Sequence, residues 1–93
     1  MGISERIRAA VVGVGYLGRF HAEKYADMTD AELVGVVDTN REQALQVARK
    51  TGASAYSDYT ELFGKVDAVS IAVPTPFHYE IARAFLDAGV DVL

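Results

Sequence analysis

Residues 11–18 read Val-Val-Gly-Val-Gly-Tyr-Leu-Gly, a G-x-G-x-x-G pattern that directly follows an apolar run. In this pattern Gly13 permits a tight turn out of a strand, Gly15 lets a ligand approach the backbone, and Gly18 lets the next helix lie close to the sheet. A second apolar run ends at Asp38, twenty positions after Gly18. The order of strand, glycine turn, helix, strand and acid predicts a dinucleotide-binding βαβ unit.

The helix that follows the glycine turn is expected to bind the diphosphate of the dinucleotide at its N-terminus. Free backbone N–H groups and the helix dipole both favour an anion there. We expect the N–H groups of Tyr16 and Leu17 to be the donors. Their side chains have a second interpretation, plain packing, which is favoured for Leu17.

Length, charge and composition exclude several classes of protein. The 93 residues are enough for one domain, residues 1–93. A net charge of −4 gives no general attraction to nucleic acid or to a membrane surface. The chain has no cysteine, which excludes disulfides and fits a cytoplasmic protein, and its two histidines lack the spacing of a metal site. No apolar run reaches the length of a membrane span.

Strand-like and helix-like segments alternate along the chain, which predicts an α/β fold. Right-handed connections then give a doubly wound, Rossmann-like parallel sheet in the order 3-2-1-4-5. The predicted strands are residues 7–12, 32–38, 53–56, 67–73 and 90–93.

Apolar residues at helical spacing predict which helix faces contact the sheet. They are Leu17, Phe20, Tyr25 and Met28 in the first helix, and Ile81, Ala82, Phe85 and Leu86 in the last. A capping box of Thr39 and Glu42 is expected to start the middle helix, and Gly52 to end it. Ser57 or Asp58 is expected to cap a brief helix before the fourth strand.

Residues 90–93 begin a fifth strand where the sequence stops. That strand would form an open apolar edge, which complete proteins usually cover. We therefore expect the chain to be a fragment of a longer protein, or its edge to pair with another chain.

Asp38, Thr39 and Arg41 form the second predicted part of the site, at the carboxyl end of the second strand. A carboxylate here can accept hydrogen bonds from the adenosine ribose hydroxyls. It would also repel a 2′-phosphate by about 4 kcal/mol at ~4 Å before screening, which favours NAD over NADP. Arg41 can pair with that phosphate, so NADP remains open. Asp38 could instead cap the second helix, and Arg41 could be a solvated surface residue.

The third predicted part of the site follows the fourth strand, at Pro74, Thr75 and His78. Two prolines restrict the backbone there, Thr75 offers a hydroxyl, and His78 lies at a helix start whose dipole favours the neutral imidazole. His78 could also simply face solvent. His21 is interpreted as a packing residue.

In their order and spacing, five segments make the chain similar to the N-terminal domain of the Gfo/Idh/MocA oxidoreductases. The segments are GVGYLG at 13–18 with His21, VVD at 36–38, YTEL at 59–62, DAVSIAVP at 67–74 with His78, and AGVDVL at 88–93. Together they run through almost the whole chain.

The resemblance implies the binding half of a two-domain, nicotinamide-dependent enzyme acting on a sugar, polyol or nucleotide-sugar. The implied cofactor contacts are Gly13, Gly15, Tyr16, Leu17, Gly18, Asp38, Thr39, Pro74, Thr75 and His78. The family continues with a Glu-Lys-Pro motif, whose lysine helps catalysis, just beyond Leu93. We therefore expect no catalytic residue in this chain, no turnover by it alone, and a parent that forms a homo-oligomer through the missing domain.

Two other functions fit the same residues. A Rossmann domain can sense NAD or NADH inside a regulator, without catalysis. The acid after the second strand also occurs in domains that bind S-adenosylmethionine or a flavin.

Overall fold

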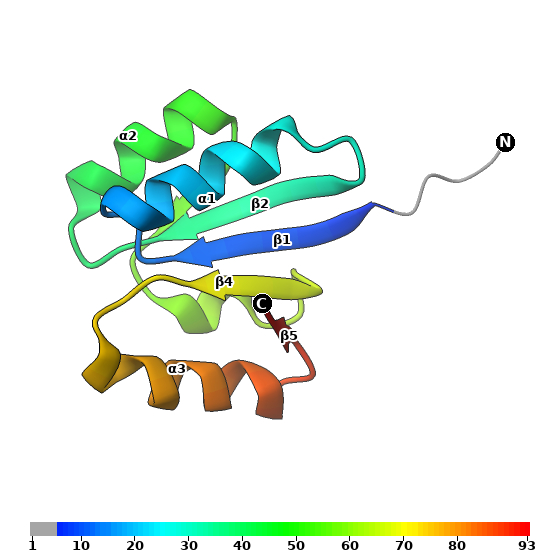
Figure 1. The fold of residues 1–93 in the computed structure, drawn as a ribbon, viewed down its shortest axis with the longest axis vertical. Coiled ribbons are helices and arrows are strands. Elements are labelled where there is room, and N and C mark those ends of the chain that lie inside the picture. Colours follow the sequence, from blue (N-terminus) through cyan, green and yellow to red (C-terminus); the bar gives the residue numbers. More distant parts are fainter. Residues whose placement is uncertain (1–5) are drawn as a thin grey trace, which may run out of the picture.

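The computed structural model describes residues 6–93, which form a five-stranded parallel sheet in the order β3-β2-β1-β4-β5 (Figure 1). The strands are β1 (Ile7–Val12), β2 (Ala31–Val37), β3 (Ser54–Tyr56), β4 (Ala68–Ile71) and β5 (Asp91–Val92). The helices are α1 (Tyr16–Asp27), α2 (Arg41–Thr51), the 3₁₀ helix η1 (Tyr59–Leu62) and α3 (Thr75–Asp87). The doubly wound α/β fold and its strand order are confirmed. The first five residues of the predicted domain lie outside the described chain.

Helices cover both faces of the sheet: α1 and α2 lie on one face, and α3 lies on the other (Figure 1). The chain runs outward from β1 to β3 and then from β4 to β5 in the opposite direction, so right-handed connections place the helices on opposite faces. Side chains of β1 alternate between the two layers: Val11 joins the cluster under α1 and α2, and Val12 joins the cluster under α3. A central strand buried on both faces must be apolar throughout its inner part.

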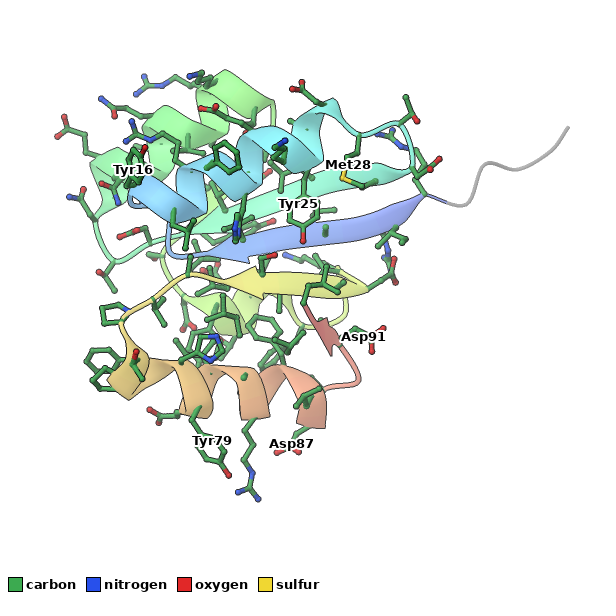
Figure 2. All side chains as sticks on the ribbon, viewed as in Figure 1. Tyr16, Tyr25, Met28, Tyr79, Asp87 and Asp91 are labelled. Carbon is green, nitrogen blue, oxygen red and sulfur yellow. The ribbon has the colours of Figure 1, made fainter. Side chains whose placement is uncertain are left out.

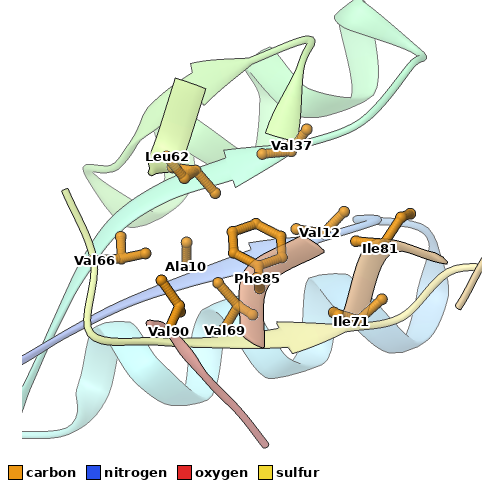
Figure 3. Close-up of a cluster of buried hydrophobic side chains, with 10 residues drawn as sticks. All are labelled: Ala10, Val12, Val37, Leu62, Val66, Val69, Ile71, Ile81, Phe85 and Val90. Atoms are coloured by element: carbon orange, nitrogen blue, oxygen red, sulfur yellow. The ribbon is translucent and has the colours of Figure 1, made fainter. Parts of the chain in front are cut away.

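Phe85 of α3 lies at the centre of the larger core cluster (Figure 3). It is fully buried, and its ring packs edge-on against Phe63 with centroids 5.2 Å apart. Ile81, one turn earlier, is also buried, as predicted. The prediction that Leu86 also faces the sheet is wrong, because this residue is 58% exposed. It lies about 100° around the helix from Phe85, beyond the narrow face that contacts the sheet.

Helix α1 contacts the sheet through a different face from the predicted one. Leu17, Phe20 and Met28 are 57%, 55% and 48% exposed, so the prediction that they face the sheet is wrong. The buried residues are Gly18 and Ala22. A Cβ on Gly18 would overlap the Gly13 carbonyl, so this close backbone approach, rather than large apolar side chains, sets the rotation of the helix.

Tyr25 completes the sheet-facing side of α1, and here the prediction holds. Its ring packs against the buried cluster under α1 and α2. Its side chain extends from α1 toward the sheet (Figure 2), and its hydroxyl forms a 2.7 Å hydrogen bond with the Ser70 hydroxyl of β4.

The N-cap of α2 is Asn40, whose side-chain oxygen accepts a hydrogen bond from the Gln43 backbone N–H at 3.1 Å. The predicted capping box of Thr39 and Glu42 is therefore wrong. Asparagine is among the best N-cap residues, and with Asn40 as N-cap the helix begins at Arg41, one residue later than the capping box of Thr39 and Glu42 requires. The predicted end of the helix is confirmed at Gly52, which adopts the left-handed conformation with φ of 81°.

The 3₁₀ helix begins after Asp58, one of its two predicted caps, which accepts a hydrogen bond from the Thr60 N–H at 2.9 Å. Strand β4 is shorter than predicted because its regular pairing with β1 stops at Ile71. The chain leaves the sheet there and turns toward Pro74 and α3.

Candidate functional site

A cleft of about 610 Å³ opens beyond the carboxyl ends of β1, β2 and β4. Its volume is within the usual range for small-molecule sites, and this end of a parallel sheet is where such folds bind ligands. Five of the predicted site residues line the cleft: Gly13, Gly15, Asp38, Thr39 and Pro74.

The glycine turn forms the floor of the cleft. Gly13 has a φ of +89°, and a Cβ on it would lie 2.6 Å from the Ala72 carbonyl oxygen, so only glycine fits. Its N–H donates to the Val37 carbonyl at 2.7 Å, which ties the turn to β2. Gly15 is different, since a Cβ on it would meet nothing within 4 Å. The turn is therefore open beside Gly15, where the glycine pattern predicts that a ligand approaches the backbone.

The first turn of α1 has free backbone donors. The earliest hydrogen bond into this helix runs from the Arg19 N–H to the Gly15 carbonyl at 2.9 Å. The N–H groups of Tyr16, Leu17 and Gly18 precede that bond and have no partner within residues 6–93. Tyr16, labelled near the start of α1 in Figure 2, is 95% exposed. These three residues can therefore serve the site through their backbone, and the side chains of Tyr16 and Leu17 are not part of the cleft lining.

Asp38 is held by three hydrogen bonds from its own chain. Its Oδ2 accepts from the Val14 backbone N–H at 2.9 Å and from Gln43 Nε2 at 3.0 Å. Its Oδ1 accepts from the Asn40 backbone N–H at 2.8 Å. The carboxylate thus links the end of β2 to the glycine turn and to α2, in a fixed orientation at the edge of the cleft. The N-cap is Asn40, so Asp38 is not the capping residue that its alternative interpretation required.

The neighbours of Asp38 differ in their access to the cleft. Thr39 lines it. Arg41 is exposed at the start of α2 and lies outside the lining. The lining contains two carboxylates, Asp38 and Glu80, and no Lys, Arg or His side chain. An anionic ligand would therefore have to rely on backbone N–H groups for its electrostatic stabilisation here.

The segment after β4 forms the opposite wall of the cleft. Pro74 lines it as expected, whereas Thr75 and His78 are exposed and lie outside the lining. Helix α3 presents Phe77, Glu80 and Ile81 to the cleft instead.

Sequence reasoning missed Gln43, Phe77 and Glu80. Residues 77 and 81 are one helical turn apart, so their shared face was available as a signal once Pro74 had placed the start of the helix. Gln43 stands five residues after Asp38, in the first turn of the next helix, and only its contact with the carboxylate distinguishes it.

A smaller cavity of about 240 Å³ lies apart from the cleft, between α1 and β4. Its lining residues are His21, Lys24, Tyr25 and Ser70. His21 therefore lies away from the cleft, and its buried Nδ1 has no hydrogen-bond partner within the described chain.

Residues 6–93 offer neither a cluster of metal ligands nor a helix that could cross a membrane. No group of three His, Cys, Asp or Glu side chains could hold a metal ion in this part of the chain. None of its helices is long and apolar enough to cross a membrane.

Comparison with known proteins gives one consistent result. The model of the Gfo/Idh/MocA oxidoreductase family, NAD-binding Rossmann fold, matches residues 7–93. UDP-N-acetylglucosamine 3-dehydrogenase of Acidithiobacillus ferrooxidans is 45% identical over 87 residues, which are 94% of this chain and 27% of that protein. An inositol 2-dehydrogenase of Rubrobacter xylanophilus is 41% identical over 80 residues, 83% of this chain and 23% of that protein.

Solved structures agree with the sequence matches. A crystal form of the Acidithiobacillus ferrooxidans enzyme superposes with a TM-score of 0.89 at 44% identity, over 95% of this chain and 28% of that one. A protein of gentamicin A biosynthesis in complex with NAD superposes with a TM-score of 0.91 at 31% identity, over 99% of this chain and 27% of that one. The chain thus spans about a quarter of the length of the relatives it matches.

Proposed function

This chain belongs to the Gfo/Idh/MocA oxidoreductase family with its NAD-binding Rossmann fold, and from that premise we propose that it is the cofactor-binding domain of a longer NAD(P)-dependent dehydrogenase. The matched relatives are dehydrogenases of which it covers about a quarter. The alternative, an NAD(H)-sensing module of a regulator, gains no support from these relatives.

One observation carries the proposal: the open glycine turn and the fixed Asp38 carboxylate border the same cleft. The diphosphate would lie beside Gly15, where the free N–H groups at the start of α1 stabilise its charge. The adenosine ribose would lie against Asp38 and Thr39. The nicotinamide end would extend along Pro74 and Phe77, the apolar wall.

The chain's own residues bind and orient the cofactor in this proposal. NAD, when bound, supplies the hydride acceptor and donor at its nicotinamide ring. The protein's share is to fix the diphosphate on backbone amides, to hold the ribose, and to place the ring against an apolar surface. The hydride would pass between the nicotinamide C4 and a hydroxyl-bearing carbon of the substrate. A sugar, polyol or nucleotide-sugar substrate is supported by relatives named for UDP-N-acetylglucosamine and inositol.

The charges of the cleft favour NAD over NADP. A 2′-phosphate beside Asp38 would face a carboxylate at a cost of about 4 kcal/mol at ~4 Å before screening. The lining offers no cation to compensate, because Arg41 lies outside it. We therefore propose NAD as the preferred cofactor.

Calorimetric titration of the 93-residue chain with NAD, NADP, FAD and S-adenosylmethionine tests this proposal. We expect binding of NAD, weaker binding of NADP, and no binding of the other two. Preferential binding of FAD or S-adenosylmethionine would contradict the proposal and assign the domain to a different class of cofactor. Dehydrogenase turnover by this chain alone would contradict the assignment of catalysis to residues outside it.

A further inference from the structure

Gln43 is one of the cleft residues that sequence reasoning missed, and it is the one that bonds to Asp38. Its side chain lines the cleft, is half-buried, and donates from Nε2 to Asp38 Oδ2 at 3.0 Å. Its backbone N–H is held by the Asn40 side chain at 3.1 Å, so its position on the first turn of α2 is fixed. We propose that Gln43 is a second residue that recognises the adenosine ribose, and that it sets the NAD preference together with Asp38. This inference rests on the proposed function.

The hydrogen-bonding capacity of Asp38 is nearly used up by its own chain. Each carboxylate oxygen has about two lone-pair sites for hydrogen bonds. Oδ2 already accepts from the Val14 N–H and from Gln43 Nε2, whereas Oδ1 accepts only from the Asn40 N–H. One acceptor site therefore remains, on Oδ1. A ribose with two free hydroxyls cannot place both of them on this carboxylate.

The Gln43 amide has the capacity that the second ribose hydroxyl needs. A primary amide has two donor hydrogens and a carbonyl acceptor, and Asp38 uses one of those hydrogens. The other hydrogen and Oε1 have no further partner within residues 6–93. They stand at the cleft beside Asp38, where they can donate to one hydroxyl oxygen and accept from its hydrogen.

The same arrangement disfavours a 2′-phosphate. The amide is neutral, so it supplies no cation to balance the phosphate charge. Its bond to Oδ2 also keeps the Asp38 carboxylate directed at the place where that phosphate would lie. Loss of Gln43 should therefore weaken NAD binding more than NADP binding.

A pair of matched substitutions in α2 tests this role. Gln43→Leu removes the amide, and Gln46→Leu makes the same chemical change on an exposed position of the same helix outside the cleft. We expect the NAD dissociation constant to rise about tenfold for Gln43→Leu, the size of one lost hydrogen bond or a little more. The Gln46→Leu variant should bind as the unsubstituted chain does. The ratio of NAD to NADP affinity should fall only for Gln43→Leu.

Deoxy forms of the cofactor separate direct contact from an effect on the fold. NAD lacking the adenosine 2′- or 3′-hydroxyl should bind the unsubstituted chain more weakly than NAD does. For one of the two analogues, that penalty should shrink severalfold in Gln43→Leu, because the partner of the missing hydroxyl is already gone. A purely structural role would leave both penalties unchanged and would overturn the inference.

Asp38→Ala distinguishes failure of this inference from failure of the proposed function. If Asp38→Ala weakens NAD binding while Gln43→Leu behaves like Gln46→Leu, the inference alone is wrong. If the unsubstituted chain does not bind NAD, or if Asp38→Ala binds it as well as the unsubstituted chain, the ribose site itself is wrong and the inference is overturned with it. Thermal unfolding of each variant in the absence of cofactor checks that the fold is retained.

Discussion

The two walls of the cleft are built in different ways. The wall formed by β1, β2 and α2 is a polar network in which backbone groups and Gln43 all converge on Asp38. The wall formed after β4 presents Pro74, Phe77 and Ile81, which offer apolar surface, and Glu80 is its one charged side chain. The first wall can therefore recognise particular polar atoms, whereas the second contributes shape and apolar contact. In the proposed function, the polar wall is the half of the site that discriminates between cofactors, and hydrogen bonds within the chain already hold its Asp38 carboxylate in place.

Gly18→Ala should have the largest effect, because it breaks the polar wall at its base. The new Cβ would overlap the Gly13 carbonyl, and neither backbone can move without separating α1 from the sheet. We expect a loss of about 4 kcal/mol or more in the free energy of unfolding, the exceptional range for one substitution. Urea denaturation followed by circular dichroism measures it.

Gly15→Ala is the matched control, since its Cβ enters open space. It should cost less than about 1 kcal/mol in stability, as a change of N-cap residue does. Its NAD affinity should nevertheless fall at least about tenfold, because the methyl group occupies the place of the diphosphate. Equal stability losses for the two glycine variants would show that the turn is not packed as described.

Phe85→Ala and Phe77→Ala compare the core of α3 with its cleft-facing side. Phe85 is fully buried, so its truncation should cost about 3–5 kcal/mol in the free energy of unfolding. Phe77 is 56% exposed, so its truncation should change stability by less than about 1 kcal/mol and act on cofactor affinity instead. Chemical denaturation and calorimetry on both variants separate the two effects. Unchanged NAD affinity in Phe77→Ala would show that the Phe77 side chain does not contribute to cofactor binding.

Asp38→Ala removes the acceptor of three hydrogen bonds and should cost about 1–3 kcal/mol in stability, because two of the three donors, the Val14 N–H and the Gln43 amide, are partly buried. NAD binding should weaken while NADP binding is spared, since the group that repels the 2′-phosphate is gone. Calorimetry with both cofactors measures the change. An equal loss of affinity for both would contradict the ribose role.

The smallest effect is expected at the opposite ends of the same strands, where Asp67 accepts hydrogen bonds from the Arg8 backbone and guanidinium. These bonds hold the pKa of the Asp67 carboxyl below its ordinary value. A lowered pKa in the folded state stabilises the fold above the unfolded-state pKa, and this stabilisation is lost as pH falls through the folded-state pKa.

Asp67→Asn should therefore lower the unfolding temperature slightly at neutral pH, with a difference that shrinks below about pH 4. Its NAD affinity should equal that of the unsubstituted chain, because Asp67 lies at the far end of the sheet from the cleft. A difference in unfolding temperature that grows on acidification would contradict the sign of the pKa shift.

The fold could be predicted from the sequence because the patterns that indicate its strands, turns and helix ends are local. The glycine pattern, the apolar inner part of β1 (residues 9–12) and the end of α2 at Gly52 each determine the local backbone, and the strand order follows from the handedness of the connections. The rotation of helices is not local. In α1 the Gly18–Gly13 approach overrode the apolar spacing of Leu17 and Phe20.

The lining of the cleft was predictable to a similar degree. Backbone positions such as Gly13 and Gly15 follow from the glycine pattern, and Asp38 follows from its spacing. Which side chains of a helix reach the cleft depends on how that helix is packed, so Phe77 replaced His78 in the lining. Gln43 could be identified as a site residue only from its hydrogen bond to Asp38 in the structure.

A titration of the ¹⁵N-labelled chain with NAD, followed amide by amide in NMR spectra, tests the central claim most directly. The account predicts the largest shifts at the backbone N–H groups of residues 15–18, with further shifts at residues 38–40. Shifts confined to the cavity between α1 and β4, at His21, Lys24 and Ser70, would contradict it.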